Sequence, residues 1–181
     1  MYVKTHRIAY LALFASFSVV LMFLGNVMAI NTLFFLAAAS FMVGVVILEW
    51  GLGAGFMFLV VCGATGLLVM PQKLYCLTYL GFGLYIWFNE FLFRALHLCR
   101  KDIKKYVLFW ILKGLIFNIM YIPMLLVFPK VIFPAGLPKV GLVPCIIVGQ
   151  VAFVVFDLVY VWFQRNVWNV LRKKIMRSAI H

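Results

Sequence analysis

Six long apolar segments, separated by short polar ones, constrain this chain more than any other feature. A helix needs roughly 20 residues to cross the ~30 Å hydrocarbon core of a bilayer. Each of the six segments approaches or reaches that length, and none shows the short alternating pattern of a membrane β-barrel. The segments are Ile8–Met28, Leu33–Leu48, Leu52–Met70, Leu74–Phe93, Val107–Phe128 and Leu142–Gln164.

The composition supports a membrane environment for these segments. Of the 181 residues, 67% are hydrophobic and 11% are charged, whereas about a quarter of the residues in a soluble domain are charged. So short a chain cannot bury this much apolar surface in water, because its surface-to-volume ratio is large. The sequence therefore predicts an all-α membrane protein with about six transmembrane helices, forming a single integral membrane domain over residues 1–181.

Basic residues indicate the orientation of these helices, because Lys and Arg are enriched on the cytoplasmic side of a membrane. With the N-terminus inside, twelve Lys and Arg residues are cytoplasmic and three, Lys73, Lys130 and Lys139, are external. The prediction is therefore N-in and C-in, in a multi-pass protein of the bacterial plasma membrane. The net charge of +12 then reflects contacts with membrane lipid, and no nucleic-acid partner is expected.

Sequence motifs for catalysis, cofactors and metals are absent. The three histidines form no HExxH pattern, and the four cysteines form no metal-ligand spacing. There is no GxSxG and no phosphate-binding loop. We expect neither an enzyme nor a cofactor or metal site.

Small residues spaced four apart suggest close helix packing, because such pairs share one helix face. Two interpretations stay open for them: packing within this chain's own bundle, or docking of a partner membrane protein. The candidate partner-docking residues are Ala12 with Ser16, Ser40 with Gly44, and Gly51 with Gly55.

Polar residues near the outer helix ends are candidates for a small-molecule site, since such sites combine apolar walls with a few polar groups. The segment Pro129–Lys139 would cover this site as a lid. The alternative is that the tyrosines belong to the interfacial aromatic belt. The candidate ligand-binding residues are Asn26, Asn31, Tyr75, Tyr79, Tyr121 and Gln150.

Two segments of the chain resemble the substrate-binding S components of energy-coupling factor (ECF) transporters. Residues 7–16 are similar to their first helix, where an Ala-x-x-x-Ala face docks on the coupling subunit; here the match is Ala12-x-x-x-Ser16. Residues 71–85 are similar to a Pro-x-Lys…Tyr…Phe-Gly-x-Tyr pattern of uncharacterised Firmicutes proteins of this type. The resemblance implies a membrane subunit that captures a small metabolite or vitamin and docks on the coupling subunit and its ATPase pair. It does not identify the ligand.

The alternative, from another class, is a non-transporting scaffold or regulatory protein that binds another membrane protein through its small-residue helix faces. A membrane-embedded enzyme acting on lipid is the least favoured hypothesis.

Two intramembrane charges, Lys113 and Asp157, predict an ion pair between the fifth and sixth helices. A charge at the centre of a membrane helix costs roughly 2.5–3.5 kcal/mol on insertion scales, so it is usually paired. With 1.5 Å of rise per residue, the two lie at similar depths from the inner surface. The pair either locks the two helices together or forms a gate; alternatively, Lys113 extends to the headgroups.

If the pair forms, Asp157→Asn should destabilise the protein by roughly 3 kcal/mol or more, because it leaves Lys113 buried without its countercharge. The double variant Lys113→Met, Asp157→Asn should recover part of that loss. Thermal unfolding in detergent measures both effects, and strictly additive losses would rule the pair out.

Overall fold

The computed structural model describes residues 2–28, 31–97, 103–127 and 142–172. The predicted lid, Pro129–Lys139, lies outside the described residues. Contacts divide the chain into two compact units, Met1–Pro134 and Ala135–His181, which are described separately. A single integral membrane domain over residues 1–181 therefore stays a prediction.

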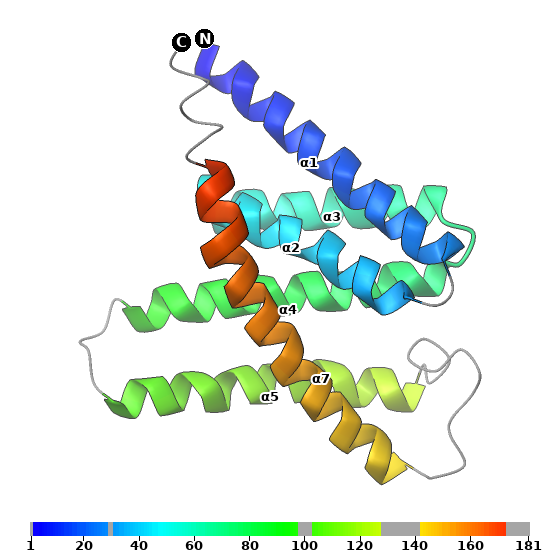
Figure 1. Ribbon diagram of the computed structural model, residues 1–181, viewed down its shortest axis with the longest axis vertical. Coiled ribbons are helices and arrows are strands. Elements are labelled where there is room, and N and C mark those ends of the chain that lie inside the picture. Colours follow the sequence, from blue (N-terminus) through cyan, green and yellow to red (C-terminus); the bar gives the residue numbers. More distant parts are fainter. Residues whose placement is uncertain (1, 29–30, 98–102, 128–141, 173–181) are drawn as a thin grey trace. The chain divides into compact units, whose positions relative to one another are not determined.

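The described residues are helical and contain no strand, which confirms the all-α prediction (Figure 1). The helices of the first unit are α1 (Tyr2–Val27), α2 (Thr32–Trp50), α3 (Leu52–Val69), α4 (Lys73–His97) and α5 (Ile103–Val127). The second unit contains α7 (Leu142–Trp162), which continues into the π-helical turn η1 (Phe163–Trp168).

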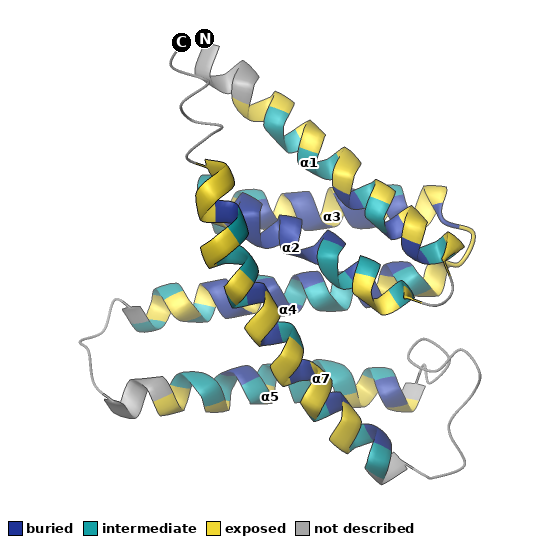
Figure 2. Ribbon diagram, in the orientation of Figure 1, coloured by how far each residue is buried: buried dark blue, intermediate teal, exposed yellow. Residues whose placement is uncertain are grey.

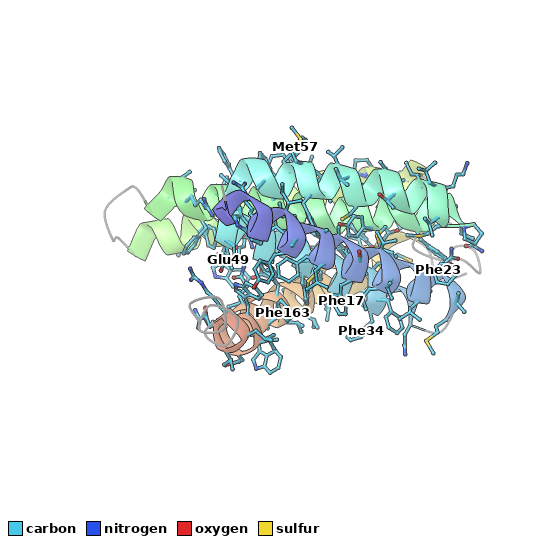
Figure 3. All side chains as sticks on the ribbon, turned by 90° about the horizontal axis from the view of Figure 1, so that it is seen from above. Phe17, Phe23, Phe34, Glu49, Met57 and Phe163 are labelled. Carbon is cyan, nitrogen blue, oxygen red and sulfur yellow. The ribbon has the colours of Figure 1, made fainter. Side chains whose placement is uncertain are left out.

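Five helical segments are long and apolar enough to cross a membrane. They lie in α1, α2, α3, α5 and α7 with its continuation. Many of their large apolar side chains are exposed, such as Leu68 (88%) and Met57 (67%), and Figure 3 shows Met57 pointing away from the helices. Such a surface suits lipid as the solvent.

Helix α4 is the exception, because polar residues lower its hydropathy. It is nevertheless 25 residues long and lies alongside α3 over the whole length of α3. Near its start, Cys76 Sγ donates a hydrogen bond to the Gly63 carbonyl at 3.0 Å. Further along α4, Trp87 Nε1 donates to the carbonyl of Leu52, the first residue of α3, at 3.0 Å. Helix α4 therefore reaches as far across the bundle as its apolar neighbour.

Helix α2 is the centre of the first unit. It packs against α1, α3 and α4, and residues 39–47 are buried without a break (Figure 2). An unbroken buried segment means that neighbours cover the helix on all sides, which explains why its sequence is apolar all round.

The turn between α2 and α3 consists of Gly51 alone. Its φ of +90° is a conformation that side chains rarely tolerate, and its N–H donates to the Ile47 carbonyl at 2.9 Å. Arg94 of α4 donates to the same carbonyl through Nη2 at 2.8 Å. This arginine thereby ties the end of α4 to the end of α2.

Gly55 allows α2 and α3 to approach closely beside this turn. A Cβ at Gly55 would lie 2.1 Å from Ile47 Cγ1, whereas a Cβ at Gly53 would meet nothing within 4 Å. We predict that Gly55→Ala lowers the free energy of unfolding by about 1–3 kcal/mol, since the extra methyl overpacks the interface.

The matched control is Gly53→Ala in the same helix, which should be neutral or slightly stabilising because alanine favours helix. Thermal unfolding of both variants in detergent checks the prediction. Equal stability of the two variants would contradict this packing of α2 on α3.

Candidate functional site

The polar interior of the first unit lies where α1, α2, α3 and α4 meet. Ser18, Tyr79 and Cys62 are all fully buried there, each with 0% exposure. Ser18 Oγ donates a hydrogen bond to the Ala39 carbonyl at 3.1 Å and lies 3.5 Å from the Tyr79 hydroxyl. A serine hydroxyl has one proton, so the tyrosine must be the donor in the second contact. The Cys62 thiol interacts with both hydroxyls.

Glycines at the α3–α4 interface create the room for these groups. A Cβ at Gly63 would lie 2.7 Å from Leu80 Cδ2, and a Cβ at Gly83 would lie 2.3 Å from Leu59 Cδ1. At both levels a leucine side chain of one helix therefore packs directly on a glycine of the other. This close approach brings Cys76 and Tyr79 of α4 to the residues of α1 and α3.

Three buried polar atoms have no hydrogen-bond partner among the described residues: Asn26 Nδ2, Thr78 Oγ1 and Asn89 Oδ1. Burying a polar group without a hydrogen-bond partner in an apolar environment costs about 2–7 kcal/mol. Such atoms mark positions where a water or a ligand would improve the structure. Thr78 and Asn89 are 11 residues apart and so lie on one face of α4.

Asn89 lies at the level of Lys113 in the antiparallel α4–α5 pair. The rings of Tyr85 and Phe117 are in contact at 6.5 Å, and those of Phe93 and Phe109 at 6.1 Å. Asn89 is midway between Tyr85 and Phe93, and Lys113 is midway between Phe109 and Phe117. Two buried polar side chains, 5% and 4% exposed, therefore occur at one level of this interface.

Lys113 lies against aromatic rings of its own helix. Its Nζ is 4.6 Å from the centre of the Phe109 ring and 5.5 Å from that of Trp110. Aromatic faces attract a desolvated cation, so α5 itself supplies part of the stabilisation of this charge.

Asp157 is 1% exposed and belongs to a buried stripe of α7 that includes Phe153 and Tyr160. Because Lys113 and Asp157 are in separate units, the ion pair between them remains a prediction.

The predicted ligand-binding residues have different surroundings. Tyr79 is fully buried in the polar interior, and Asn26 contributes one of the unpartnered atoms. Asn31 is exposed and precedes α2 without a side-chain cap, while Tyr75 is half-buried. Tyr121 stacks on Phe117 at 5.1 Å. Gln150 is half-buried and lies in the second unit.

The predicted docking residues also divide into two groups. Ala12 and Ser16 are both exposed on α1, whereas Ser40, Gly44 and Gly55 are buried. Gly51 forms the α2–α3 turn. Burial favours the first interpretation, packing within the bundle, for Ser40, Gly44 and Gly55. Ala12 and Ser16 are the pair that lies on an exposed helix face.

No protein-family model, no curated protein and no solved structure matches the chain. Within the described residues, no group of three or more His, Cys, Asp or Glu side chains lies together.

Sequence reasoning did not select Ser18, Thr78 or Asn89 as site residues. A signal was present, because Thr78 and Asn89 are polar residues within an otherwise largely apolar helix. The sequence alone does not say which of such residues face the interior.

The Ser18–Tyr79 contact can be tested through its coupling energy. Ser18→Ala should cost about 1–3 kcal/mol, because it leaves the buried Tyr79 hydroxyl with one partner fewer. The double variant Ser18→Ala, Tyr79→Phe should lose less than the sum of the two single changes. Unfolding free energies of the four proteins measure this, and additive losses would show that the hydroxyls do not interact.

Proposed function

We propose that this protein is a substrate-capture subunit of an ECF-type transporter, which binds a small metabolite or vitamin from outside. The observation that carries the proposal is the buried polar interior of the first unit, together with the unpartnered Asn26 Nδ2 on the same helix as Ser18. In an apolar bundle, polar groups of this kind are retained at a cost, and binding a polar ligand is a function that would offset it.

The energy for uptake would come from partner proteins, because the sequence contains no phosphate-binding loop. In this proposal both termini are cytoplasmic, as the distribution of basic residues indicates. The coupling subunit would dock on α1 through Ala12 and Ser16, where both small residues are exposed. The resemblance of residues 7–16 to S components supports the same face.

The scaffold hypothesis is the second candidate, and the exposed Ala12–Ser16 face favours it equally. The two functions differ in the partner and in the ligand. An S component associates with an ATPase pair and its coupling subunit and retains a small molecule. A scaffold associates with another membrane protein and retains none.

Affinity purification from native membranes, followed by native mass spectrometry, tests the proposal. We expect the full-length chain to recover a coupling subunit with an ATPase pair and to carry a bound small molecule. Ala12→Phe should abolish recovery of the partners, because a large side chain prevents close helix approach, while the ligand is retained.

The matched control is Ala64→Phe, which changes an exposed alanine of α3 and should leave the complex intact. Recovery of a different membrane protein without a small molecule would reject the transporter and favour the scaffold.

A further inference from the structure

Three buried sulfur-containing side chains, from α1, from the end of α3 and from α4, converge on one point beside Gly66. A Cβ at Gly66 would lie 2.7 Å from Met22 Cε, 3.0 Å from Cys76 Sγ and 3.3 Å from Met70 Cε. Met22 and Cys76 are 0% exposed, and Met70 is 3% exposed. Because position 66 has no side chain, the three side-chain ends share the space that a Cβ would occupy.

The ligand chemistry of this cluster is soft. Thioethers and thiolates select monovalent copper over hard cations, which prefer oxygen ligands. The Cys76 thiol is free and donates to the Gly63 carbonyl at 3.0 Å, so it forms no disulfide that would prevent coordination. Methionine side chains have three rotatable bonds and adapt easily, so the two thioether sulfurs can turn toward a bound ion.

We propose that Met22, Met70 and Cys76 form a binding site for Cu(I). On binding, the Cys76 thiol releases its proton to water, its thiolate bonds to the ion, and the two thioether sulfurs complete a three-coordinate site. There is no change of oxidation state. One thiolate and one monovalent cation give a neutral site, which suits an apolar interior where net charge is costly. A divalent ion would leave a net positive charge.

The connection between α3 and α4 places the cluster close to the end of these two helices. Met70 caps the end of α3, and Cys76 is on the first turn of α4. Pro71, Gln72 and Lys73 between them are exposed. The three sulfur-containing side chains therefore lie next to exposed residues at this end of the helix pair.

The inference does not depend on the proposed function, because the purified chain alone can be tested. The reduced full-length protein, in detergent without oxygen, is titrated with Cu(I) against a chromophoric Cu(I) chelator. We expect one ion per chain held against the chelator, with at least tenfold weaker binding in Cys76→Ser and in the double variant Met22→Leu, Met70→Leu. Cu(I) should also raise the unfolding temperature of the wild type and not that of Cys76→Ser.

These substitutions are chosen to preserve the fold. Serine still donates to the Gly63 carbonyl, and leucine nearly conserves the volume of methionine. Two matched controls should bind Cu(I) like the wild type: Cys145→Ser, a buried cysteine in the second unit, and Met57→Leu, an exposed methionine of α3. The proposal is overturned if the wild type yields all Cu(I) to the chelator, or if the cluster variants bind as tightly as the controls. Either result would mean that Met22, Met70 and Cys76 only fill space between the helices.

Discussion

The close contact between α3 and α4 positions several of the polar side chains of the first unit. An additional methyl group at Gly63, Gly66 or Gly83 would collide with side chains that pack against these glycines. The α3 carbonyls consequently come within hydrogen-bond distance of Cys76 and Trp87. In lipid, apolar burial contributes little to helix association, so this close packing and these hydrogen bonds must supply much of it.

Once α3 and α4 are in contact, hydrogen bonds and the α2–α3 turn position α1 and α2. Tyr79 reaches Ser18 of α1, which in turn reaches the backbone of α2. At the other end of the pair, Arg94 donates to the last turn of α2. The single-residue turn at Gly51 fixes α2 beside α3. Helix α2 is thus enclosed by α1, α3 and α4, which these hydrogen bonds and the turn hold in place.

The sequence predicted the helices well because hydropathy reports directly on lipid as a solvent. Its boundaries were less accurate where a helix continues beyond the membrane. The apolar segment was predicted to begin at Ile8, but the helix starts at Tyr2. Likewise, α4 continues past Phe93 to His97. Backbone hydrogen bonds continue into the polar region, where hydropathy gives no indication of a helix.

The candidate site was less predictable, because spacing identifies residues on one face without telling which neighbour that face meets. Ser40 and Gly44 show the same spacing as Ala12 and Ser16, but the first pair is buried and the second is exposed. The sulfur cluster shows this limit most clearly. Met22, Gly66 and Cys76 belong to three helices, and only the packing of those helices brings them together.

Helix α4 explains why the polar groups gather in this part of the molecule. Its hydropathy alone would place it poorly in lipid, since Thr78, Asn89 and Glu90 would each face hydrocarbon at a cost. All three are instead buried, because α2, α3 and α5 pack around this helix. The neighbouring helices therefore take the place of lipid around α4. Polar residues that a ligand would meet inside this bundle are therefore shielded from lipid, on α4 as on α1 and α5.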